Sequence, residues 1–61
     1  MLGHIVKLNR SEGYAYVRPR SGPDVLIKGH NMPGDLRKGD VIEFSTCYSR
    51  GLQAVDVTKI M

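Results

Sequence analysis

The sequence predicts an all-β protein that folds as a small five-stranded Greek-key barrel. Three observations favour this fold class. No stretch shows sustained helical periodicity, short runs of β-branched and aromatic residues alternate with polar ones, and turn residues recur about every 8–12 positions. A barrel is favoured over an open sheet because closure removes the strand edges that short strands would otherwise leave unpaired.

The first expected strand covers residues 4–8 and ends at a turn-forming stretch, residues 9–13. The second covers residues 14–18 and ends at Pro19, which has no N–H to donate to a strand ladder. Residues 21–24, Ser-Gly-Pro-Asp, have the composition of a turn and lead into the next strand.

The third expected strand covers residues 25–28. A loop follows over residues 29–39, because glycine and proline interrupt any regular pattern there. The fourth expected strand covers residues 41–48, the Ser-Arg-Gly of residues 49–51 turns the chain, and the fifth strand covers residues 52–60.

Alternation along each strand predicts which side chains face inward, since neighbouring residues of a strand point to opposite faces. The first strand is an exception, because its apolar residues fall at both parities and its inward face can be assigned only if it contains a β-bulge. The expected core residues are Ile5, Val17, Val25, Ile27, Ile42, Phe44, Val55 and Val57.

The length and composition indicate one domain over residues 1–61, without repeats or linkers. A domain of this size buries only about 60% of its unfolded surface, so a net stability of roughly 3–5 kcal/mol is expected. Cys47 is the only cysteine, so an intramolecular disulfide is excluded. His4 and His30 lack the paired spacing of a zinc site, and we expect no metal and no cofactor.

The chain is basic, with nine Lys and Arg against six Asp and Glu and a formal net charge of +3. This surplus suits a polyanionic partner. A lone cysteine and the lack of a secretory signal favour the cytoplasm, and no apolar run is long enough to cross a membrane. A monomer is the expected state.

Four segments of the chain resemble motifs of one family, in the same order and at the same spacing. Residues 12–17, Glu-Gly-Tyr-Ala-Tyr-Val, are similar to the first ribonucleoprotein motif of cold-shock domains, Lys-Gly-Phe/Tyr-Gly-Phe-Ile. Residues 24–28, Asp-Val-Leu-Ile-Lys, are similar to the second, Asp-Val-Phe-Val-His. Residues 36–44 and 50–57 resemble Leu-x-x-Gly-x-x-Val-x-Phe and Arg-Gly-Pro-Gln-Ala-x-x-Val. The chain therefore resembles the cold-shock domain family, whose fold is the oligonucleotide-binding (OB) barrel.

The resemblance implies binding of single-stranded RNA or DNA on the face that carries the first two motifs, by an RNA chaperone or a regulator of transcription or translation. The residues agree with it, since Tyr14 and Tyr16 offer rings on which bases can stack while basic side chains follow the phosphates. The residues expected to contact nucleic acid are Lys7, Arg10, Tyr14, Tyr16, Leu26, Lys28, His30, Arg50 and Gln53.

The chain departs from the family mainly where the family has aromatic rings. Lys7 and Leu8 stand in place of tryptophan and phenylalanine, and Leu26, Lys28 and Gly29 replace the phenylalanine, the histidine and the following aromatic of the second motif. The loop after the third strand is also shorter than in typical bacterial members. Binding could have shifted toward electrostatics, with weaker affinity and stronger salt dependence.

Two other interpretations remain open at this stage. The face that has lost its rings could serve as a protein-interaction surface, or the barrel could be of another basic kind, such as a one-domain translation initiation factor. Catalysis is not expected, because the spacing suggests no Ser–His–Asp or Cys–His set, no carboxylate pair and no phosphate-binding glycine loop before a helix.

Overall fold

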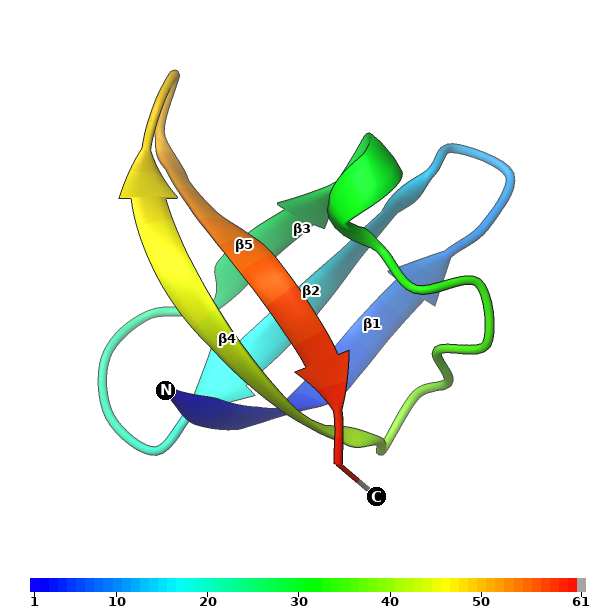
Figure 1. Ribbon diagram of the computed structural model, residues 1–61, viewed down its shortest axis with the longest axis horizontal. Helices are drawn as coiled ribbons and strands as arrows, with labels where there is room; N and C mark the ends of the chain where they lie inside the picture. Colours follow the sequence, from blue (N-terminus) through cyan, green and yellow to red (C-terminus); the bar gives the residue numbers. More distant parts are fainter. Residues whose placement is uncertain (61) are drawn as a thin grey trace.

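The computed structural model describes residues 1–60, which form a closed all-β barrel of five strands (Figure 1). The predicted fold class is therefore confirmed, and the predicted strand boundaries differ from the observed ones by at most two residues. The elements are β1 (Leu2–Asn9), β2 (Tyr14–Pro19), β3 (Val25–Lys28), the short 3-10 helix η1 (Gly29–Asn31), β4 (Val41–Tyr48) and β5 (Leu52–Lys59).

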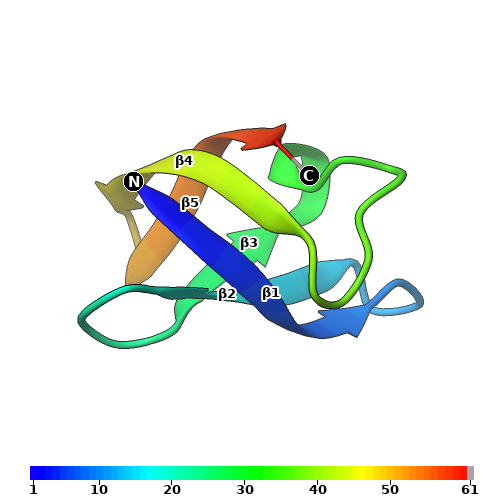
Figure 2. The same cartoon turned by 90° about the horizontal axis from the view of Figure 1, so that it is seen from below.

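The strands follow one another around the barrel in the order β1-β2-β3-β5-β4, and β4 pairs with β1 to close it. This is the Greek-key order of an OB-fold-like barrel. Figure 2 shows β1 running between β2 and the start of β4. The pairs are antiparallel except β3 with β5, which lie parallel and share one register pair, Leu26 with Gln53.

A β-bulge in β1 explains why apolar residues of this strand occupy both odd and even positions. Ile5 pairs with Val17, but the next pair is Lys7 with Tyr16, so Val6 is an extra residue on β1. The bulge lets Ile5 and Leu8 both turn toward the interior, where Ile5 is fully buried and Leu8 packs against the core. It also leaves Lys7 on the outer surface.

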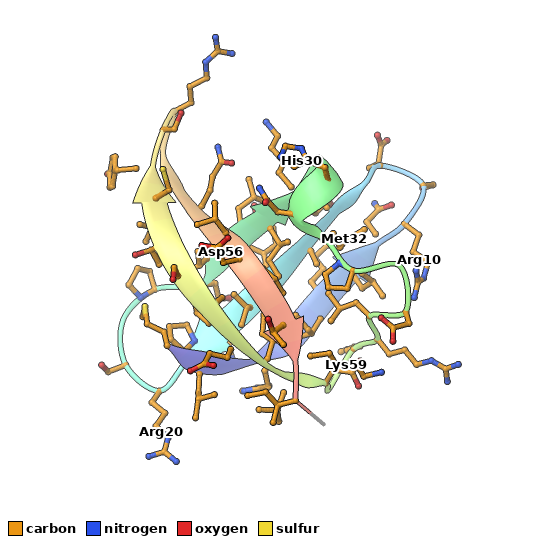
Figure 3. The ribbon with its side chains drawn as sticks, viewed as in Figure 1. Arg10, Arg20, His30, Met32, Asp56 and Lys59 are labelled. Atoms are coloured by element: carbon orange, nitrogen blue, oxygen red, sulfur yellow. The ribbon has the colours of Figure 1, made fainter. Side chains whose placement is uncertain are left out.

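A second irregularity, in β5, makes one part of the predicted core wrong. Between the pairs Glu43 with Thr58 and Ser45 with Val55, β5 contains one residue more than β4. Asp56 lies in this interval with a φ of 51°, in the left-handed region that few residues other than glycine adopt (Figure 3). The bulge reverses the alternation, so Ala54 is buried where Val55 was expected.

The interior contains nine buried hydrophobic residues, and no described polar side chain is buried among them. Val57, expected in the core, is only partly buried against it. Leu36, which lies in the β3–β4 loop, is fully buried, as is Ala15; neither was predicted. The buried hydrophobic residues are Ile5, Ala15, Val17, Val25, Ile27, Leu36, Ile42, Phe44 and Ala54.

The end of the β3–β4 loop is tied to β1 and β5 by polar contacts. The backbone of Ile5 donates to the carbonyl of Asp40 at 2.9 Å and accepts from Gly39 at 2.8 Å. The carboxylate of Asp40 accepts from the backbone N–H of Arg37 at 2.8 Å and lies 3.3 Å from the ammonium of Lys59. The hydrogen bond from the Arg37 N–H, together with the charge of Lys59, holds the pKa of this carboxyl below its usual range. Partial desolvation acts in the opposite direction and raises the pKa, but it is the smaller effect.

The β1–β2 turn, η1 and the β4–β5 turn lie toward one end of the barrel, whereas the β2–β3 loop lies at the other (Figure 1). Within residues 1–60, we find no helix with the length and apolar character needed to cross a membrane.

Candidate nucleic-acid interface

A row of predicted site residues crosses four strands on the outer surface of the barrel. In the register, Lys7 lies beside Tyr16, Tyr16 beside Leu26, and Leu26 beside Gln53. These side chains face outward because their chain neighbours, such as Val17 on β2, are buried inside. Residues that are far apart in the sequence thus form one continuous strip.

A second row lies next to the first, nearer the end that carries the β1–β2 turn. Asn9 pairs with Tyr14, and Tyr14 pairs with Lys28. The ammonium nitrogen of Lys7 lies 5.7 Å from the centre of the Tyr14 ring, within the distance of a cation–π contact. Lys7 is therefore close to both tyrosines, in position to meet a phosphate beside a base stacked on either ring.

The two tyrosine rings are nearly perpendicular to each other. Their centroids lie 5.9 Å apart and their planes meet at 80°. A base that stacks on one ring therefore meets the edge of the other, and two successive bases can stack in parallel only if one ring turns. Both tyrosines are partly exposed, so they are open to such contacts. We name the surface formed by Lys7, Tyr14, Tyr16, Leu26 and Lys28 the tyrosine face.

His30 and Gln53 adjoin the tyrosine face on the side of η1. Together with Lys28 they line an open depression between η1, the β1–β2 turn and β5. Figure 3 shows His30 on η1 at the same end of the barrel as these turns. The amide nitrogen of Gln53 donates to the carbonyl of Ser49 at 2.8 Å, which fixes the orientation of this side chain.

Arg10 lies apart from the tyrosine face and already has partners. Its guanidinium donates to the carbonyl of Gly34 at 2.7 Å and to the carbonyl of Leu36. Figure 3 shows the side chain directed at the β3–β4 loop. Because these bonds hold the segment that places buried Leu36 in the core, we assign Arg10 a structural role and leave it out of the proposed interface.

Arg50 lies in the turn between β4 and β5, outside both rows. Its backbone adopts a φ of 54°, and Gly51 after it has a φ of 102°, so the turn depends on left-handed conformations at both positions. The side chain is exposed. Arg50 therefore lies outside the tyrosine face as defined above.

Two arginines at the far end of the barrel were not among the predicted site residues. Arg18 follows Tyr16 on the outer face of β2 and forms an ion pair with Asp24 at 2.9 Å. Their hydrogen bond, with the attraction between the two charges, raises the pKa of Arg18 and lowers the pKa of Asp24. Arg20 is exposed on the β2–β3 loop, as Figure 3 shows.

Glu12 is a further member of this region that the pattern of the sequence did not single out. It lies in the β1–β2 turn and lines the depression with Lys28 and Gln53. The only signal in the sequence is that an acidic residue occupies the position where the first ribonucleoprotein motif usually has lysine. The direction of a turn side chain such as Glu12 cannot be deduced from the alternation of inward and outward residues along strands.

The described residues include no cluster of three or more His, Cys, Asp or Glu that could hold a metal ion. Cys47 is an exposed free thiol on β4, opposite Gln53 in the register.

In comparisons with known proteins, no family model and no curated protein matches this chain.

Proposed function

We propose that this protein binds single-stranded RNA or DNA on the tyrosine face and catalyses no reaction. The observation that carries the proposal is the register that sets Lys7, Tyr16 and Leu26 side by side on three neighbouring strands. Aromatic rings flanked by cations are the combination that single-stranded nucleic acid needs, since bases stack on rings while cations neutralise phosphates.

The proposed ligand is an unpaired strand, because bases in a duplex already stack on one another and are not free to stack on protein rings. Stacking tolerates any base, so the tyrosine face itself has little sequence preference. With two rings and two lysines, binding depends strongly on charge. In the cell we place this activity in the cytoplasm, as a monomeric RNA chaperone or regulator of transcription or translation, in line with the resemblance to cold-shock domains.

The test is a titration of the protein with a fluorescent single-stranded heptamer at low salt. We expect binding that is weakened by Tyr14→Ala and by Tyr16→Ala, each by about 1–3 kcal/mol for the loss of one stacked base. Tyr48→Ala is the matched control, because this tyrosine is 84% exposed on β4 and lies outside the tyrosine face.

Two results would contradict the proposal: no binding at high micromolar protein, or an affinity that the double variant Tyr14→Ala and Tyr16→Ala leaves unchanged. Either would favour the alternative that the barrel surface contacts a protein. A pull-down would then recover a stoichiometric protein partner that survives nuclease treatment.

A further inference from the structure

An open depression lies beside the tyrosine face, between η1 and the β1–β2 turn. It is lined by Glu12 and Gly13 from the β1–β2 turn, by residues 28–31, and by Gln53 from β5. Its volume is about 340 Å³. This lies within the range of about 300–1,000 Å³ that small-molecule sites occupy.

Hydrogen bonds fix the walls of the depression before any ligand binds. The N–H of Gly29 donates to the carbonyl of Gly13 at 3.0 Å, which joins η1 to the β1–β2 turn. The side-chain oxygen of Asn9 accepts from the N–H of Glu12 at 3.0 Å and from the hydroxyl of Ser11 at 2.9 Å. The backbone of Glu12 is therefore held in place.

The polar groups around the depression differ in what they can offer. An ionised carboxylate only accepts hydrogen bonds, and an ammonium only donates them. Within residues 1–60, Glu12 takes part in no ion pair, so its two oxygens remain available. Lys28 also lines the depression and carries a cationic donor. The depression thus combines a double acceptor with a donor.

Among the four bases, guanine matches this combination best. Its Watson–Crick edge carries two adjacent donors, N1–H and the 2-amino group, and its O6 and N7 accept from lysine. Adenine and cytosine present one amino group next to a ring nitrogen acceptor, and uracil and thymine present one N–H between two carbonyl oxygens. Only guanine can give both oxygens of one carboxylate a donor without placing an acceptor against them.

We propose that this depression is a subsite for one unpaired guanine, with Glu12 reading the Watson–Crick edge. The inference rests on the proposed function, because the tyrosine face must hold the strand that delivers the base. It adds a base preference that stacking alone does not give. It also accounts for an acidic side chain at the margin of a basic surface.

The experiment compares a heptamer of thymidine with seven heptamers that each carry one guanosine, using fluorescence anisotropy at constant low salt. For the intact chain we expect at least one guanosine position to bind about tenfold more tightly than oligothymidine, as a well-formed pair of base contacts gives. For Glu12→Gln we expect this preference to disappear, while oligothymidine binds at least as tightly as before.

Glu43→Gln is the matched control, because it removes the same charge from an exposed position on β4, beside Leu2. We expect it to keep the guanosine preference. Equal affinity for all eight heptamers would overturn the subsite and leave the proposed function standing. A preference for cytidine or adenosine in a second series, or a guanosine preference that Glu12→Gln retains, would overturn it as well. Failure of every heptamer to bind would contradict the proposed function itself.

Discussion

At the scale of single residues, Arg10 shows that a basic side chain expected to bind nucleic acid can serve the fold instead. Its guanidinium bridges from the start of the β1–β2 turn to the carbonyls of Gly34 and Leu36. Leu36 is fully buried although it lies in a loop, so the loop must be held against the barrel for the core to be complete.

We therefore expect Arg10→Ala to lower the free energy of unfolding by about 1–2 kcal/mol, since hydrogen bonds from a charged donor are lost. The affinity for single-stranded oligonucleotides should stay unchanged under conditions where the variant is folded. Urea denaturation and anisotropy titration measure the two quantities. A large loss of affinity without a loss of stability would return Arg10 to the interface.

Lys7 and Lys28 are expected to act on phosphates, and the salt dependence of binding tests this role. Each phosphate contact with a single strand contributes about 0.7 to the slope of log K against log salt concentration. Lys7→Ala and Lys28→Ala should each reduce the slope by about that amount. Lys38→Ala, on the β3–β4 loop, removes the same charge and should leave the slope nearly unchanged; an equal reduction there would point to net charge alone.

At the scale of elements, the two bulges mark what the sequence could and could not predict. The bulge in β1 was detectable, because apolar residues at both parities are incompatible with a regular strand that has one buried face. The bulge in β5 was not, since Val55 and Val57 alternate as a regular strand would. Only the pairing of β4 with β5 reveals the extra residue, and pairing is a property of two strands together.

The residues of the candidate site also fall into those that the sequence could place and those that it could not. The residues on strands, among them Tyr14, Tyr16 and Lys28, could be placed together because alternation fixes which face each side chain shares. The site residues that lie in turns could not be placed in this way, because turns have no such alternation. The different surroundings of Arg10 and Glu12 depend on the path of the β3–β4 loop and on η1, and no short-range pattern determines either.

Close packing of β1 on β2 leads to a prediction at Gly3. A side-chain carbon there would lie 2.7 Å from the carbonyl oxygen of Arg18 and 2.7 Å from a methyl of Val17. Backbone and core atoms cannot move away easily, so Gly3→Ala should destabilise the barrel by about 1–3 kcal/mol. Gly34→Ala is the control, because nothing lies within 4 Å of the added carbon. Thermal unfolding of the two variants should differ clearly, and equal midpoints would contradict the prediction.

At the scale of the whole molecule, Asp40 links stability to pH. The pKa of its carboxyl is lower in the folded state, through the Arg37 N–H and Lys59, than the value of about 3.9 for an unfolded chain. The stabilisation is therefore fully present above the unfolded pKa and is lost as the pH falls through the folded pKa. Wild type should exceed Asp40→Asn in stability at pH 7, and the difference should shrink below about pH 4.

Denaturation curves of both proteins at a series of pH values measure this difference. Asp35→Asn serves as the control, because that carboxylate is exposed and lies 3.9 Å from Lys59. A difference between wild type and Asp40→Asn that stays constant from pH 7 to pH 2 would show that the carboxyl contributes nothing through its charge.

The parallel contact of β3 with β5 is the place where the barrel is expected to open locally most often. One register pair, Leu26 with Gln53, joins these strands. Leu26 belongs to the tyrosine face, and Gln53 adjoins it. Transient opening should be most frequent between these two strands, because every other pair of neighbouring strands shares at least three register pairs. A bound strand would span the opening and hold it shut, so amide exchange in β3 should slow as oligonucleotide is added. Ligand at one hundred times its Kd would add about 2.7 kcal/mol to the unfolding free energy. The protein would then be most rigid when it is occupied.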